Sequence, residues 1–213
     1  MDGSRDDFGG RIGPNALLQL MDVLDRTTGH PFRLALFAEA GVVPPPPDAG
    51  MWPEREVAAV HRALRRLLPG QAPDLLAEAG RAVGDYILAH RIPAPARALL
   101  RMLPARLGAR LLASAISRHA WTFAGSGQFR VLSHDPLTFE ITANPLIAGE
   151  EAQEALCHWH AAVFQRLFSR LVWPRAKIDE VACAAAGAPS CRFVNWPDAA
   201  MRHGKKGLPD SML

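Results

Sequence analysis

Apolar residues recur at helical spacing through the first half of the chain. Leu17, Leu20 and Leu24, for example, fall on one face of a helix. This period predicts helices over residues 16–25, 32–40, 54–68 and 74–90, and one or two helices over 99–117 with a break near Pro104 and Gly108. Between the second and third helices, the proline-rich segment 42–47 predicts an extended spacer rather than a docking motif.

The pattern changes in the second half, where apolar residues begin to alternate. Two strands are expected over 120–133 (with a turn at Gly125-Ser-Gly127) and 137–143, a long helix over 150–172, and a hairpin from 177–183 and 191–196. The long helix would have an acidic first turn and a basic last turn, which suits the helix dipole. This order predicts an α+β fold in which N-terminal helices pack with an antiparallel sheet and a long helix.

The expected organisation is a single folded unit with loose ends. We expect disorder over residues 1–13, a mainly helical region over 14–118, an α+β core over 119–197 and a flexible tail over 198–213. Residues 13–197 should form one unit, since 213 residues suit a single domain.

Composition narrows the class of protein. The formal net charge of +3 is too small to indicate nucleic-acid binding, although many arginines raise the pI to about 9.1. No apolar run is long enough to predict a transmembrane segment, and the polar, acidic N-terminus does not resemble a secretory signal. Three cysteines without a leader favour a reducing compartment, so we expect a cytoplasmic protein.

All three cysteines lie in the C-terminal third of the chain together with a candidate carboxylate. Cys157 falls within the predicted long helix, while Glu180, Cys183 and Cys191 belong to the predicted hairpin. Three thiolates and one carboxylate fit the tetrahedral coordination that zinc prefers, and they suit magnesium or calcium poorly. On spacing alone, three unrelated buried cysteines remain an equal alternative, because Cys-x7-Cys is looser than the usual zinc knuckles.

These residues resemble a known family. Glu180-Val-Ala-Cys183 followed by Gly187-Ala-Pro-Ser-Cys191-Arg-Phe193 is similar to the end of the 4-vinyl reductase domain, and the spacing resembles the zinc site of aromatic-responsive sensor domains with this fold. Upstream, segments 84–93 and 118–127 resemble the members of bacteriochlorophyll biosynthesis. The resemblance, which covers roughly residues 13–196, implies a ligand-binding domain with a structural zinc held by Cys157, Glu180, Cys183 and Cys191.

The same resemblance implies a tetrapyrrole ligand. The leading hypothesis is a protein that binds a porphyrin or chlorophyllide intermediate and acts as a carrier or accessory factor to a bacteriochlorophyll-biosynthesis enzyme. One alternative is an 8-vinyl (4-vinyl) reductase of divinyl (proto)chlorophyllide that takes electrons from a partner, and another is a small-molecule sensor. The sequence shows no dinucleotide fingerprint and too few cysteines for an iron–sulfur cluster, so whether the chain is itself an enzyme stays open. Related domains pair through N-terminal helices, so a homodimer is expected.

Candidate pigment contacts lie where the helices give way to strands. Arg118 and His119 precede Trp121 and Phe123, which combine a cation and an imidazole with apolar rings. Other candidates are the arginines 91, 97, 101, 106 and 110 and the histidines 90 and 134. For each of these, a solvated helix face or a core position is the alternative. His158 and His160 flank Cys157 and are expected to point away from the metal.

Overall fold

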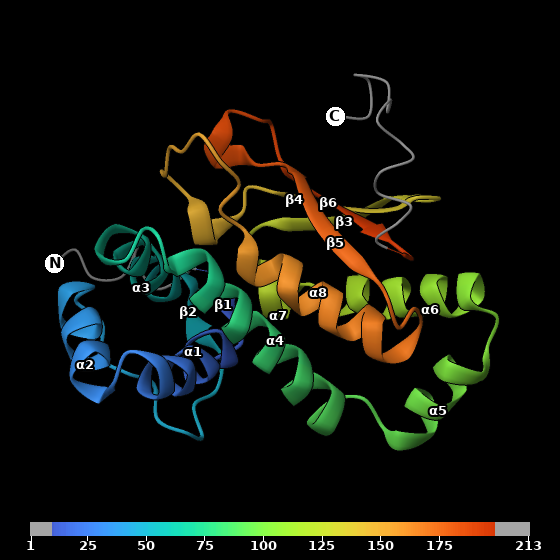
Figure 1. Cartoon of the computed structure of the whole chain (residues 1–213), viewed down its shortest axis with the longest axis horizontal. Helices are drawn as coiled ribbons and strands as arrows, with labels where there is room; N and C mark the ends of the chain where they lie inside the picture. The colour runs from blue at the N-terminus through green and yellow to red at the C-terminus, as the bar shows by residue number, and fades with distance from the viewer. Residues whose placement is uncertain (1–9, 199–213) are drawn as a thin grey trace, which may run out of the picture.

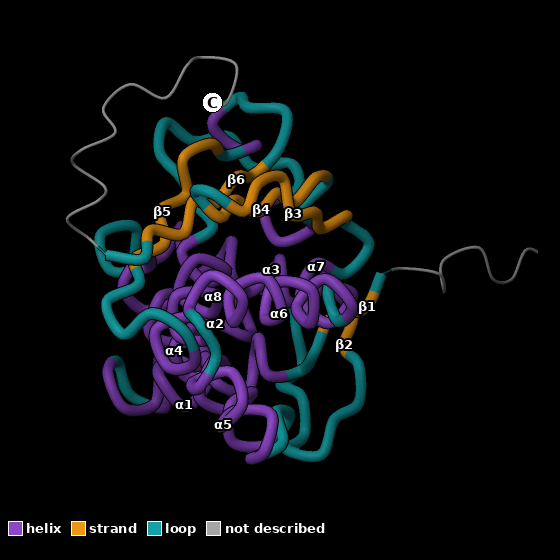
Figure 2. The backbone as a smooth tube through the Cα atoms, turned by 90° about the vertical axis from the view of Figure 1, so that its right-hand side faces the viewer, coloured by secondary structure: helices purple, strands orange, loops and turns teal. Residues whose placement is uncertain are grey.

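The computed structural model describes residues 10–198, in which helices cover one face of a four-stranded antiparallel sheet (Figures 1 and 2). This arrangement confirms the predicted α+β fold. The helices are α1 (Asn15–Thr27), α2 (His30–Glu39), α3 (Glu54–Leu67), α4 (Ala72–His90), α5 (Ala94–Met102), α6 (Ala105–Arg118), α7 (Trp121–Ala124) and α8 (His158–Leu171), with 3-10 turns η1 (Pro145–Ile147) and η2 (Ala184–Ala186).

The sheet has the strand order β3-β4-β6-β5, and every neighbouring pair is antiparallel. Its strands are β3 (Gln128–His134), β4 (Leu137–Thr142), β5 (Lys177–Ala182) and β6 (Cys191–Trp196). The predicted hairpin is therefore present as β5 and β6, with Phe193 opposite Glu180 on one side and Phe139 on the other.

Two segments predicted at the start of a strand and of a helix are different in the structure. The predicted strand 120–133 is wrong at its start: Trp121–Ala124 form a helical turn, because the N–H groups of Thr122 and Phe123 bond back to His119 and Ala120. Gly125 has φ +57° and ends this turn, so the strand begins only at Gln128. The alternation of large residues had the right period but came from a turn that buries only one of its two rings.

The predicted helix 150–172 is wrong over its first seven residues. Its acidic residues do not form a first turn, because Glu150 turns back to pair with Arg65 of α3, both side chains being nearly buried. The N–H of Ala152 donates to the carbonyl of Ala185 in η2, which also holds the segment as a loop. Helix α8 therefore begins at His158, immediately after Cys157.

Three smaller differences concern the ends and the middle of the chain. Pro104 separates α5 from α6, whereas Gly108 is buried inside α6 and causes no break. Residues 10–13 are ordered, contrary to the predicted disorder, because strand β1 (Arg11–Ile12) pairs with β2 (Trp52–Pro53). The remaining residues 1–9, and the predicted tail except residue 198, lie outside the described part of the chain.

Aromatic rings fill the space between α8 and the sheet. Phe164 of α8 lies 5.2 Å from Phe139 of β4 and 5.5 Å from Phe193 of β6, measured between ring centroids. Phe123 of α7 and Phe129 of β3 extend this cluster toward the other edge of the sheet. Because such rings contribute most of the buried apolar area per residue, this cluster fixes α8 against the sheet.

The crossing of α4 and α8 depends on glycine. A Cβ atom on Gly80 would lie 2.4 Å from the carbonyl oxygen of Trp159, and one on Gly84 would lie 2.6 Å from the Cβ of Arg166. The two helices therefore approach more closely than any larger residue would permit.

We predict that Gly80→Ala destabilises the protein by about 1–3 kcal/mol, although alanine normally favours a helix over glycine. The added methyl would overlap a backbone oxygen, which cannot rotate away. Gly70→Ala is the matched control, since nothing lies within 4 Å of the position its Cβ would take. Thermal or urea unfolding measures both; equal stability of the two variants would contradict the close crossing.

A second prediction concerns His160, which is buried among these rings with Nε2 3.2 Å from the carbonyl oxygen of Phe123. Burial lowers the pKa of His160 to about 4 from 6.5. The folded state therefore binds fewer protons than the unfolded state below pH 6.5, and stability should fall as the pH drops toward 4. The expected loss at pH 5 is about 2 kcal/mol relative to pH 8.

Chemical unfolding at both pH values measures this loss. His160→Gln keeps a hydrogen-bond donor but cannot titrate, so its stability should change less over this interval. His90→Gln, at an exposed histidine, should keep the wild-type pH dependence. An identical pH dependence in His160→Gln and the wild type would contradict the assignment.

Candidate metal centre

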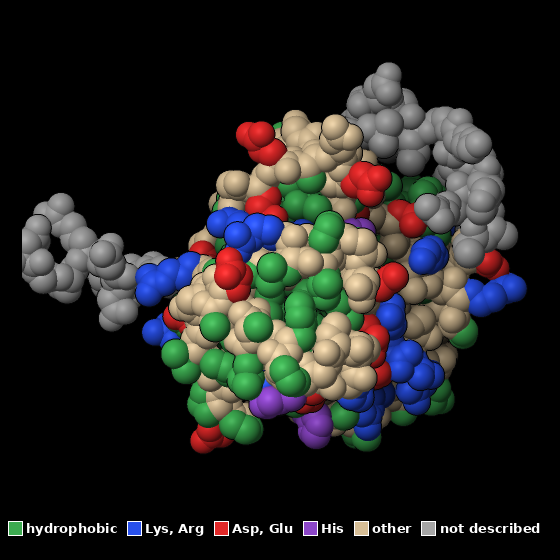
Figure 3. All heavy atoms as spheres, turned by 60° about the vertical axis from the view of Figure 1, so that its left-hand side comes forward, with side chains coloured by type: hydrophobic (Ala, Val, Ile, Leu, Met, Phe, Trp, Pro, Cys, Tyr) green, Lys and Arg blue, Asp and Glu red, His purple; other side chains and the backbone are tan. Residues whose placement is uncertain are grey.

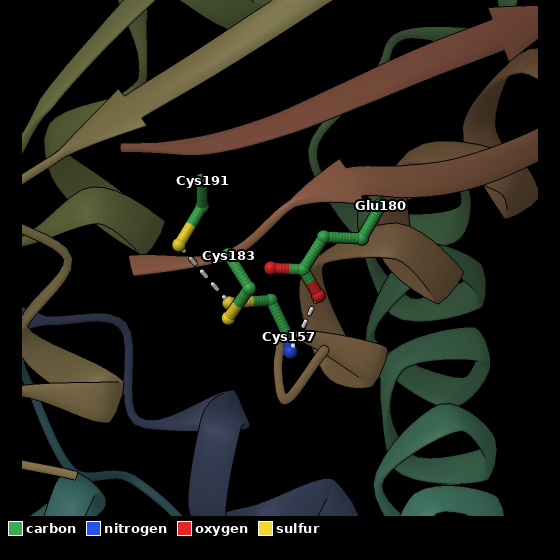
Figure 4. A group of neighbouring side chains, drawn as sticks. All are labelled: Cys157, Glu180, Cys183 and Cys191. Carbon is green, nitrogen blue, oxygen red and sulfur yellow. Dashed lines mark hydrogen bonds between the residues drawn. The ribbon is translucent and has the colours of Figure 1, made fainter. Parts of the chain in front are cut away.

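The four side chains singled out in the sequence converge at one end of the β5–β6 hairpin (Figure 4). Cys157 ends the loop before α8, and Glu180 lies on β5. Cys183 follows β5 and Cys191 begins β6, and the turn between them includes Gly187 at φ +88°. This left-handed conformation explains why a glycine stands where the chain reverses.

The donor atoms are close enough to share one ion. One sulfur from each cysteine and one carboxylate oxygen all lie within 4.8 Å of one another. The sulfurs of Cys157 and Cys191 are 3.4 Å apart, far beyond a disulfide bond and near the roughly 3.8 Å separation of two thiolates on a tetrahedral zinc.

One buried oxygen in the cluster lacks a partner. Glu180 Oε2 accepts a 2.8 Å hydrogen bond from the backbone N–H of Cys157, whereas Oε1 is buried with no hydrogen-bond partner. Buried carboxylate oxygens are almost always satisfied, so an unpaired one beside three sulfurs indicates a cation-binding position.

The electrostatics of the cluster lead to the same conclusion. Burial, together with the negative charge of Cys183, raises the pKa of Glu180 to about 8. Hydrogen bonds with Cys183 and Cys191, and burial, raise the pKa of the Cys157 thiol well above its usual value. Hydrogen bonds from Cys157 and Cys191 lower the pKa of Cys183. Protons thus hold the cluster together around one thiolate, and a metal ion would replace them with a single divalent charge.

Asn144 completes the surroundings of the sulfurs and was missed from the sequence. Its Nδ2 lies 3.3 Å from the sulfur of Cys157 and 3.8 Å from that of Cys191, while its Oδ1 accepts the N–H of Leu146. Backbone N–H groups of Leu156 and Ala184 add donors to Cys183 and Cys191. Only the fold brings Asn144 to the cluster, so no sequence spacing identifies it.

The candidate pigment residues do not form one pocket. Arg118 and His119 are exposed at the end of α6, Trp121 is 56% exposed, and Phe123 packs into the aromatic cluster. The ring Nδ1 of His119 lies 2.9 Å from the carbonyl oxygen of Ala115. Their role as ligand contacts stays a prediction.

A cavity of about 590 Å³ lies at the opposite end of α6. Arg106 and Arg110, one helical turn apart, stand on one side of it, and Trp173 and Trp196 on another. His134 in the β3–β4 turn also lines it. Three of these five, Arg106, Arg110 and His134, were among the lesser candidates in the sequence.

Comparisons with known proteins agree with these features. The family model of the 4-vinyl reductase domain matches residues 137–195, a stretch that includes all four donors. The chain is 60% identical to the bacteriochlorophyll synthase 23 kDa chain of Cereibacter sphaeroides over 88% of this chain and 91% of that one. It is 53% identical to the protein of the same name from Rhodobacter capsulatus, over 95% and 92%.

Among solved structures, an Fe(II) unliganded H-NOX protein from K. algicida superposes with a TM-score of 0.57. It covers 86% of this chain and 95% of that one at 13% identity, so this similarity concerns the fold alone.

We predict about one divalent metal per chain, zinc according to the sequence, in protein purified without chelators. Cys183→Ser and Glu180→Gln should each lower the metal content and the unfolding temperature, because binding at structural zinc sites contributes on the order of 10 kcal/mol to folding. Glu154→Gln is the control, since it removes an exposed carboxylate from the loop before Cys157. Elemental analysis and thermal unfolding of the same samples measure both effects. Wild-type protein with little metal, or Cys183→Ser with unchanged stability, would contradict the prediction.

Proposed function

The chain belongs to the family of bacteriochlorophyll synthase 23 kDa chains and carries the 4-vinyl reductase domain, and on that premise we propose that it binds a tetrapyrrole intermediate of bacteriochlorophyll biosynthesis. In this proposal, the protein carries the pigment to a biosynthetic enzyme or presents it there. The name shared by the two relatives supports the pathway, since it describes each of them as one chain of a synthase.

The cavity beside α6 is the observation that carries the proposal. Its volume of about 590 Å³ falls within the range of small-molecule sites. Two tryptophans supply flat apolar surface for a macrocycle, and Arg106 and Arg110 offer two guanidinium groups for its carboxylates. Neither arginine has a carboxylate partner within residues 10–198.

A zinc ion would serve this site by holding its framework. Four protein donors complete a tetrahedral shell, so the ion would be structural rather than a site for substrate. Strand β6 begins at Cys191 in the metal cluster and ends at Trp196 in the cavity wall, about 17 Å away for five extended residues. The metal cluster and the ligand cavity are thus opposite ends of one buried strand.

We predict that the metal-loaded protein binds protoporphyrin IX or its magnesium complex with a shift of the Soret band. Arg106→Gln combined with Arg110→Gln should weaken binding at least about tenfold, because each charged hydrogen bond contributes roughly 1.5–3 kcal/mol. Arg118→Gln combined with His119→Gln is the matched control, at the other end of the same helix. Metal content should be equal in all samples.

The outcomes separate the alternatives. If the Arg118/His119 pair weakens binding and the Arg106/Arg110 pair does not, the contacts predicted from the sequence are correct and the cavity is not the site. An absence of binding by wild-type protein would contradict the proposal. Steady conversion of divinyl to monovinyl pigment by the purified protein with NADPH would replace the carrier role with that of a reductase.

A further inference from the structure

One end of the molecule, formed by α5, α6, α7 and β3, exposes an unusual number of large apolar side chains. Six of the nine exposed large hydrophobic residues between residues 10 and 198 are located there. They are Leu99 (55% exposed), Met102 (83%), Leu107 (46%), Leu111 (45%), Trp121 (56%) and Leu132 (46%). We refer to these six residues as the apolar end face.

The apolar end face does not arise from poor packing of α6. The buried side of this helix includes Ala109, Leu112 and Ile116, whereas Leu107 and Leu111 lie one turn apart on the side exposed to solvent. Helix α5 has no buried residue at all. Figure 1 places α5 and α6 together at one end of the molecule, where they contact each other.

The charge of this region is exclusively positive. From residue 86 to residue 134 the sequence contains seven arginines and no aspartate or glutamate. The rest of the chain has 17 basic and 21 acidic residues, so its formal charge is negative. A different face, shown in Figure 3, has acidic and basic side chains interspersed.

These arginines have no carboxylate partners in the described part of the chain. Arg97 donates to the carbonyl of Leu88, and Arg101 donates to that of Arg170. Arg118 takes part in none of the ion pairs. The positive charge next to the apolar end face is therefore not neutralised within residues 10–198.

We propose that the apolar end face docks on the surface of an anionic lipid bilayer. Apolar side chains that project between arginines match the two layers of such a surface, since the former enter the acyl boundary and the latter reach the phosphates. Trp121 suits the interface between them. No helix within residues 10–198 is long and apolar enough to cross a bilayer, so the contact is peripheral.

The occupant is a bilayer rather than a protein because of the charge pattern. A protein interface commonly presents both signs of charge around its rim, whereas this end presents one sign over 49 consecutive residues. A uniformly anionic surface complements that pattern over the whole face.

Vesicle flotation tests the proposal in the absence of any pigment. Protein with its metal bound should float with vesicles of phosphatidylglycerol and phosphatidylcholine, and should not float with phosphatidylcholine alone. Raising the salt from about 0.05 M to about 0.5 M should release most of it, because screening shortens the reach of the arginines.

Two sets of exposed substitutions give the decisive comparison. Leu99→Ser, Met102→Ser, Leu107→Ser and Leu111→Ser together should weaken binding to anionic vesicles at least tenfold. The matched control is Leu34→Ser, Val43→Ser and Leu67→Ser, which changes the other three exposed apolar residues. Neither set lines the cavity, so pigment binding should persist in both and separates this test from that of the proposed function.

Three results would overturn the proposal. They are no flotation of wild-type protein at low salt, equal loss of flotation in both sets, and flotation that is unchanged in the first set. Light scattering on the same samples identifies a dimer contact instead if the first set converts a dimer to a monomer without changing flotation.

Discussion

Four negative donors cannot lie together in the interior of a protein without a cation. The cluster of Cys157, Glu180, Cys183 and Cys191 meets this constraint with protons when no metal is bound, and a divalent ion would meet it with less charge left unbalanced. Each donor belongs to a different turn of the fold, so satisfying the cluster fixes the start of α8, the end of β5 and the start of β6 together.

The constraint extends from the metal cluster to the ligand cavity through one strand. Phe193, in the middle of β6, packs against Phe164 of α8, and Trp196 at its end donates from Nε1 to Asp179 of β5. A change in the cluster would therefore shift a strand that is held by core packing and by both neighbours. This coupling explains how a site without an open coordination position can still matter for ligand binding.

How far the sequence predicts this structure differs between its parts. The donor set and the β5–β6 hairpin follow from short-range spacing, which local chemistry determines. The loop before Cys157 could not be predicted, because it depends on the pairing of Glu150 with Arg65, 85 residues earlier in the chain. Asn144 and the cavity likewise arise from long-range packing, so only the general class of pocket residue was accessible, and its position was not.

Helix α6 shows how one short element can combine several tasks. Its alanines and Ile116 face the core, Arg106 and Arg110 reach the cavity, and Leu107 and Leu111 project outward. A pigment is largely apolar, so its transfer through water would be unfavourable by the area it exposes. A cavity that shares a helix with a bilayer-facing surface shortens that transfer, and this is the physical reason why the two proposals support each other while remaining separately testable.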